Sequence, residues 1–274
     1  NRERTGVRGA PVTVATLDGG RVLLAEDNDV NRTVFRRMIQ LLGVECDAVP
    51  DGAAAAEALL GANPYDVALM DLQMPGTDGF EATRLVRAAG NATPILALTA
   101  TALHGDKERC LAVGMNGHLS KPITLPELRA ALVPYLSKSS SPAPPEAPPA
   151  AEAPAPVADL DLSRLRELEE QLEDRALVVA TVDTFLAQLD GRRFALSDAL
   201  RRQDHDALRA AAHTLKSSSA LLGAQPLADA CAEVERQAVA GTSAERLTRL
   251  VAEVESSVTG ATRVMKSYLA GDER

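Results

Sequence analysis

Short apolar runs alternate with longer helical patterns five times between Arg21 and Leu136, and this alternation constrains the fold more than any other feature. The runs at 22–25, 66–70 and 94–98 have the composition of buried strands, and weaker runs lie at 44–48 and 117–120. Helical patterns occupy 31–42, 53–60, 79–89, 105–113 and 126–136. Strands that alternate with helices build a parallel sheet with helices on both faces. We therefore predict a doubly wound α/β domain with five parallel strands at 21–136.

A stretch rich in Pro, Ala and Ser ends this domain. Residues 137–158 read SKSSSPAPPEAPPAAEAPAPVA, in which Val157 is the only branched aliphatic residue. Such a segment cannot bury enough apolar surface to fold, so we predict a flexible linker. Residues 1–20 are weakly patterned, and we predict a leader or an upstream linker there. Because the chain begins with Asn1 rather than Met, we expect it to be a piece of a longer protein.

From Asp159 to Arg274 the apolar residues recur at helical spacing, and Pro226 is the only proline. Helical patterns occupy 162–173, 176–203, 206–222, 226–240 and 244–270. Asp204 is a predicted N-cap, and Gly223 stands where a helix should end. We predict an all-α domain at 159–274, a bundle of four main helices preceded by a short one.

Composition excludes several classes of function. The net charge of −9 argues against nucleic-acid binding. No stretch approaches the roughly 18 apolar residues that span a bilayer, so we expect no membrane contact by this fragment. The three widely spaced cysteines are typical of packing residues in a reducing compartment, which favours a cytoplasmic location. No glycine-rich ATP-binding motif is present, so we expect no kinase activity from the chain itself.

Polar residues stand at the ends of four predicted strands of the α/β domain. They are Glu26, Asp27, Asp71, Thr99 and Lys121. Parallel strands end at one edge of the sheet, so these side chains should cluster. Three acids in one cleft repel one another and favour a divalent cation such as Mg²⁺. Asp71 is the central candidate nucleophile for a phosphoryl group, whose oxygens Mg²⁺, Lys121 and Thr99 would neutralise or bind. Solvated loop charges, the alternative interpretation, would not favour such a set at consecutive strand ends.

Four strings carry these residues: LLAEDNDVNR, LMDLQMPGTDGFEATR, PILALTA and LSKPI. With them, segment 21–136 resembles a response-regulator receiver domain of the kind attached to hybrid histidine kinases. The resemblance implies a flavodoxin-like sheet in which Asp71 is phosphorylated, while Thr99 and Lys121 form a switch around the phosphate. The implied ligands of Mg²⁺ (or Mn²⁺) are Glu26, Asp27, Asp71 and the backbone of Gln73. One position departs from the family pattern, because His118 replaces the usual Tyr or Phe. We predict a partly exposed strand residue there.

A second candidate acceptor lies in the string AAHTLKSSSALLGA. His213 stands in the middle of an amphipathic helix, beside its apolar stripe, and shares a face with Lys216 and Ser217. Small neighbours should leave the imidazole open to an incoming domain, and Lys216 could pair with a phosphoryl group on the ring. From spacing alone, a surface or structurally satisfied histidine is the favoured interpretation.

Segment 159–274 is similar to histidine phosphotransfer (HPt) domains, whose signature reads His-x-Leu-Lys-Gly-Ser with a Gly-Ala pair further on. The resemblance implies that His213 carries a phosphoryl group and that Lys216 supports it. Ser217 departs from the pattern, because glycine is typical at this position. Its hydroxyl could slow docking of a partner or add a hydrogen bond.

The other polar candidates have plainer interpretations. His205 and His104 are predicted to be surface residues at helix starts. The basic patch of Arg192, Arg193, Arg201 and Arg202 is predicted to be a charged bundle surface rather than a docking rim.

Together these features predict the C-terminal part of a hybrid sensor histidine kinase. A phosphoryl group would pass from an upstream kinase histidine to Asp71, in a step that the receiver domain itself catalyses. It would then move to His213 and on to a separate response regulator. A non-catalytic interaction scaffold, or a phosphate sink with one silent site, is the alternative. Whether transfer occurs within one chain or between chains is not decided by the sequence.

Overall fold

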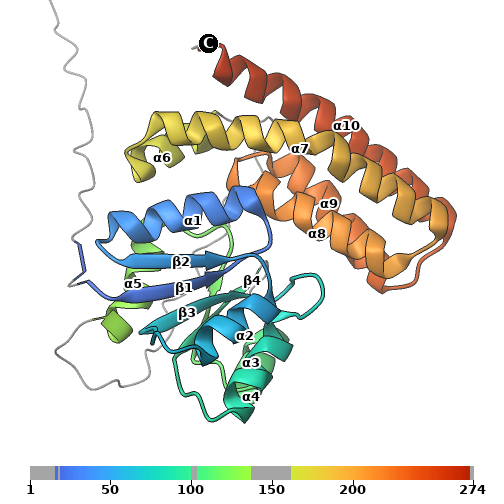
Figure 1. The fold of residues 1–274 in the computed structure, drawn as a ribbon. Helices are drawn as coiled ribbons and strands as arrows, with labels where there is room; N and C mark the ends of the chain where they lie inside the picture. Colours follow the sequence, from blue (N-terminus) through green and yellow to red (C-terminus); the bar gives the residue numbers. More distant parts are fainter. Residues whose placement is uncertain (1–15, 18, 100–103, 137–161, 272–274) are drawn as a thin grey trace, which may run out of the picture.

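The computed structural model describes residues 16–17, 19–99, 104–136 and 162–271, and of 104–106 only the backbone. The predicted linker at 137–158 and most of the predicted leader lie outside this part of the chain. The described residues form an α/β domain at 19–136 and a helical bundle at 162–271 (Figure 1).

The α/β domain contains the five predicted parallel strands, in the order β2-β1-β3-β4-β5. They are β1 Arg21–Ala25, β2 Glu45–Val49, β3 Val67–Asp71, β4 Ile95–Thr99 and β5 Gly117–Ser120. The predicted doubly wound sheet is therefore confirmed. β3 and β4 each run one residue further than predicted, because Asp71 pairs with Leu98 and Thr99 with Ser120. Asp71 and Thr99 are thus the last residues of their strands.

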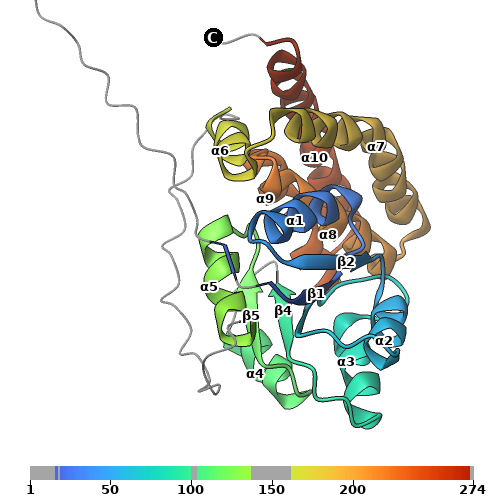
Figure 2. The ribbon, with the colours of Figure 1, turned by 60° about the vertical axis from the view of Figure 1, so that its left-hand side comes forward.

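Five helices cover the two faces of the sheet (Figure 2). They are α1 Asp29–Leu41, α2 Gly52–Leu60, α3 Gly79–Ala88, α4 His104–Ala112 and α5 Leu125–Leu136. Buried side chains of α1 and α5 share one apolar cluster, and those of α2, α3 and α4 share the other. α1 begins two residues earlier than predicted, because the Asn28 side chain accepts a hydrogen bond from Val30 N and caps the helix.

The bundle contains the predicted short helix and four longer ones. They are α6 Ser163–Leu172, α7 Arg175–Arg202, α8 His205–Leu221, α9 Gln225–Val239 and α10 Ala244–Leu269. Asp204 caps α8 by accepting from Ala207 N, and Gly223 follows its end with φ +80°, as predicted. α7, α8, α9 and α10 pack in sequence, and α10 closes the bundle against α7.

The two parts pack against each other through α1, which contacts α6, α7 and α8. The apolar cluster under α1 and α5 continues into the bundle core. All three cysteines are buried and free, as packing residues should be. In the described ranges, no helix combines the length and the apolar character needed to cross a membrane.

Candidate functional site

Three carboxylates gather at the carboxyl edge of the sheet. Glu26 and Asp27 follow β1, and Asp71 ends β3; one oxygen of each lies within 4.8 Å of the others. We call this set the acidic cluster. Arg32 holds the loop of the first two acids, since its guanidinium donates to Glu26 O at 2.7 Å and to Asp27 O at 3.3 Å. The predicted gathering of these acids is therefore present.

Lys121 neutralises part of the acidic cluster. Its Nζ lies 2.6 Å from Glu26 Oε2 and 2.5 Å from Asp71 Oδ2. Burial alone would lower the pKa of this lysine, but the charges of Asp71 and Glu26 raise the pKa by a larger amount. The net shift of the pKa is therefore upward. Lys121 is therefore a fixed cation between two acids.

The acids resist ionisation in this setting. Burial raises the pKa of Glu26 to about 7; Lys121 opposes this shift, and the charge of Asp71 adds to it. Burial, followed by the charge of Asp71, also raises the pKa of Asp27. Neighbouring carboxylates repel one another when all of them are ionised, and a hard divalent cation that binds their oxygens removes this repulsion. The acidic cluster can thus hold a metal ion.

Two further predicted residues lie at the same edge. Thr99 is buried at the end of β4. The backbone amide of Gln73 donates to Asp71 Oδ1 at 3.1 Å. This contact brings the Gln73 backbone beside Asp71, while the part of its carbonyl as a metal ligand stays a prediction.

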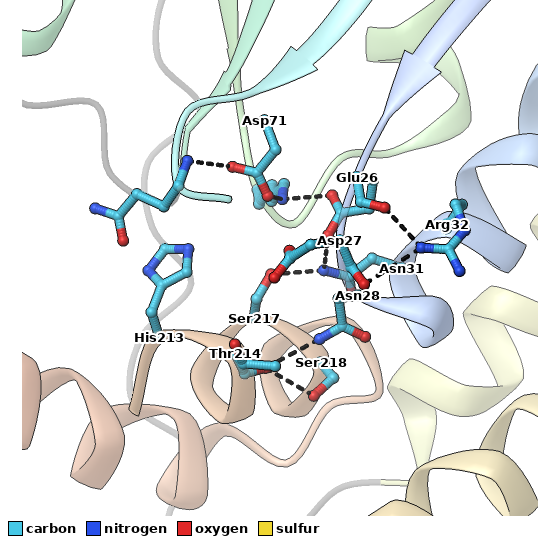
Figure 3. Close-up of polar contacts among 12 residues, drawn as sticks. Glu26, Asp27, Asn28, Asn31, Arg32, Asp71, His213, Thr214, Ser217 and Ser218 are labelled. Carbon is cyan, nitrogen blue, oxygen red and sulfur yellow. Dashed lines mark hydrogen bonds and ion pairs between the residues drawn. The ribbon is translucent and has the colours of Figure 1, made fainter. Parts of the chain in front are cut away.

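His213 of α8 points from the bundle toward the acidic cluster, facing Asp71 (Figure 3). The imidazole faces the α/β domain and is buried: His213 is 6% exposed and Asp71 is 3% exposed. The ring is covered because the α/β domain packs against α8 and Glu235 of α9 packs beside the ring.

Glu235 is a site residue that sequence reasoning missed. His213 Nδ1 lies 3.0 Å from Glu235 Oε1, and Lys216 Nζ donates to Glu235 Oε2. Although burial would raise the pKa of Glu235, His213 and Lys216 together lower it to about 2. The carboxylate thus fixes the ring through Nδ1, which leaves Nε2 as the nitrogen available for reaction. Lys216 shares this carboxylate with His213, while its pairing with a phosphoryl group stays a prediction.

The start of α1 meets α8 directly. Asn31 Nδ2 donates to Ser217 Oγ at 2.6 Å, and Asn28 Nδ2 donates to Thr214 O at 3.0 Å (Figure 3). A residue on α7 joins this contact, because Arg192 donates to Asn28 Oδ1 at 3.3 Å. Of the predicted basic patch, Arg192 therefore contacts the α/β domain, and its interpretation as plain bundle surface is wrong. The interpretation holds for the others, which pair with bundle acids: Arg193, Arg201 and Arg202.

The remaining histidines stand outside the site. His118 is half-buried in β5, where burial and then the charge of Lys107 lower its pKa. His205 is the partly exposed first residue of α8. His104 begins α4, and its side chain lies outside the described residues.

Two protein families match separate parts of the chain. Residues 22–133 match the family Response regulator receiver domain, and residues 180–257 match the family Hpt domain. Sensor protein GacS of Pseudomonas syringae pv. syringae is 33% identical over 221 residues, which are 78% of this chain and 24% of that protein. Sensor histidine kinase RcsC of Salmonella typhi is 35% identical over 131 residues, 47% of this chain and 14% of that protein.

Among solved structures, the receiver domain of sensor histidine kinase PA1611 from Pseudomonas aeruginosa PAO1, with a magnesium ion in its active site cleft, is similar to this chain. It is 44% identical with a TM-score of 0.41, and the match covers 43% of this chain and 98% of that one. The chain spans less than a quarter of the length of the two curated relatives named above.

Proposed function

We propose that this chain carries a phosphoryl group from Asp71 to His213. It contains a response regulator receiver domain followed by an Hpt domain, and so belongs to the proteins of two-component phosphorelays. The observation that supports this most is that His213 faces Asp71 across the contact between α/β domain and bundle (Figure 3). Segments 21–136 and 159–274 would be the two functional units, with 137–158 as their linker.

The acidic cluster would bind Mg²⁺ through Glu26, Asp27 and Asp71, with the Gln73 carbonyl as a further ligand. Bound there, the ion would neutralise charge on the phosphoryl oxygens. Lys121 already lies 2.5 Å from Asp71 Oδ2 and would neutralise another oxygen. Thr99, at the neighbouring strand end, would supply a hydroxyl to a third. Asp71 would act as the nucleophile that becomes an acyl phosphate.

Transfer to the bundle would use the geometry around His213. The Nε2 lone pair would attack phosphorus, the new N–P bond would form as the P–O bond to Asp71 breaks, and that electron pair would return to the carboxylate. The ring would keep its Nδ1 proton, donated to Glu235 at 3.0 Å, and would become positively charged. The carboxylate of Glu235 would balance that charge, and Lys216 would pair with the phosphoryl oxygens.

The partners follow from the same chemistry. An upstream kinase histidine, in this polypeptide or another, would supply the phosphoryl group to Asp71. A receiver domain of a separate response regulator would take it from His213. The chain would be the C-terminal part of a hybrid sensor histidine kinase, and this part would work in the cytoplasm.

The test is to locate the label after incubation with Mg²⁺ and radioactive acetyl phosphate. The wild-type chain should carry label on His213, which resists alkali, and Asp71→Ala should carry none. His213→Ala should retain an alkali-labile label on Asp71, whereas His205→Ala, on the same helix, should behave as wild type. An unlabelled wild-type chain would favour the scaffold. Label on Asp71 that is lost to water without reaching His213 would favour the sink.

A further inference from the structure

One buried hydrogen bond joins the acidic cluster to the helix that carries His213. Asn31 Nδ2 donates both to Ser217 Oγ, at 2.6 Å, and to Glu26 Oε1, at 3.0 Å. Asn31 is 1% exposed and Ser217 is 8% exposed. Since Glu26 also binds Lys121, this amide connects the bundle to the groups around Asp71.

Ser217 can make this contact because it stands one helical turn after His213 and presents its side chain on the same face. A small residue without a hydroxyl would fit equally well, but the Asn31 amide would then lose a buried acceptor. A buried donor without a hydrogen-bond partner costs free energy, because in water the same donor would bind a water molecule. The serine therefore favours the docking of this α/β domain on this bundle.

A second contact holds the two parts together away from the acceptors. α6 lies before the Hpt match at 180–257, and it packs on α1 (Figure 2). Its leucines Leu165, Leu168 and Leu172 are buried in the apolar cluster that contains the inner face of α1. Gln171 of α6 accepts a hydrogen bond from Leu125 N, at the start of α5. A helix outside the range of the Hpt match thus anchors the bundle to the α/β domain.

Resting on the proposed function, we infer that the Asn31–Ser217 hydrogen bond, together with the contact of α6 with α1, selects the bundle of the same chain as the acceptor for this receiver domain. Transfer from Asp71 to His213 is then intramolecular. In this docked state both acceptors are buried, so an external partner reaches either of them only after the two parts separate.

Intramolecular transfer is tested by its dependence on chain concentration. In the wild-type chain, the first-order rate of label passing from Asp71 to His213 should not change with concentration. A mixture of Asp71→Ala and His213→Ala chains can transfer only between molecules. Because tethered partners meet at an effective concentration in the millimolar range, the mixture at micromolar concentration should be slower by a factor of about a thousand.

Equal rates in the mixture and the wild-type chain, both proportional to concentration, would overturn the inference while leaving the proposed function intact. Absence of label on His213 at every concentration would overturn the proposed function, and the inference with it.

Docking itself is tested without phosphoryl transfer. Diethyl pyrocarbonate modifies an accessible imidazole, and mass spectrometry can compare His213 with His205 in one sample. In the wild-type chain His213 should react more slowly. Ser217→Ala should speed its modification about fivefold, the factor for one net hydrogen bond of about 1 kcal/mol. Alanine favours the helix, and the rate at His205 monitors folding.

The matched control is Ser257→Ala on α10, whose hydroxyl donates to Glu253 O within its own helix. It should leave the His213 rate unchanged. A Ser217→Ala rate equal to that of wild type, or a wild-type His213 that reacts as fast as His205, would refute the docking contact.

Discussion

The charge cluster around Glu235 predicts a stability difference that can be measured as a function of pH. The pKa of Glu235 falls from its ordinary 4.5 to about 2, because His213 and Lys216 hold the ionised form. The difference of 2.5 between these values, at about 1.36 kcal/mol for each factor of ten in proton affinity, corresponds to about 3.4 kcal/mol. The side chain is 13% exposed, so solvent screening removes little of this figure.

The sign of the pH dependence follows from the lowered pKa. This contribution to stability is fully present above pH 4.5 and is lost as the pH falls toward 2. Two-state linkage with these values leaves about 1.4 kcal/mol at pH 3. Glu235→Gln removes the charge but keeps one acceptor. At pH 7 it should therefore lower the free energy of unfolding of the bundle by between about 1.5 and 3.4 kcal/mol.

The assay is urea denaturation followed by circular dichroism at pH 7 and pH 3. The gap between wild type and Glu235→Gln should narrow at the lower pH. Glu233→Gln is the control, since Glu233 lies on the same helix and pairs with the exposed Arg236. It should shift the free energy of unfolding by less than about 1 kcal/mol. Equal midpoints for the two variants at pH 7 would refute the reasoning.

Three further predictions concern the acidic cluster and the bundle core. Lys121→Ala should slow labelling of Asp71 by acetyl phosphate about 100- to 1000-fold, the effect of losing one preorganised charge in a buried site; a smaller loss would make the lysine structural. Since the raised pKa of Glu26, about 7, lets a proton compete with the metal, Mg²⁺ affinity measured by calorimetry should fall about fivefold from pH 7 to pH 6. An affinity independent of pH would contradict this. Phe185→Ala removes a fully buried side chain and should lower the free energy of unfolding of the bundle by about 3–5 kcal/mol in urea denaturation. A loss below about 1 kcal/mol would mean that the core collapses around the gap.

The positions at the sheet edge could be predicted because they depend on local pattern and topology alone. Once the runs at 66–70 and 94–98 are strands of a parallel sheet, the residues after them must share one edge. The structure places Asp71 and Thr99 at that edge, although each belongs to its strand rather than to the following loop. Strand ends are uncertain by a residue because pairing partners, which the sequence does not show, decide them.

The environment of His213 could not be predicted in the same way. Glu235 lies 22 residues further along the chain, and Asn31 is 186 residues away from Ser217. An acid on an amphipathic helix is ordinary, and only the packing of α8 against α9 brings Glu235 to the ring. For the same reason the burial of His213 could not be predicted, since helical spacing shows the face of a residue but not what covers it.

The two departures from the family patterns, His118 and Ser217, are the sequence features that would support an interaction scaffold. His118 lies half-buried in β5, and the acidic cluster is formed by Glu26, Asp27 and Asp71, so the replacement at His118 removes no group from the cluster. Ser217 contacts Asn31 and so adds a hydrogen bond between the two parts instead of separating them. An interaction scaffold would need only the contact between the two parts. It would not need Lys121 at 2.5 Å from Asp71, or a carboxylate that orients His213. The arrangement of charged groups on both sides of the contact therefore favours transfer over a scaffold.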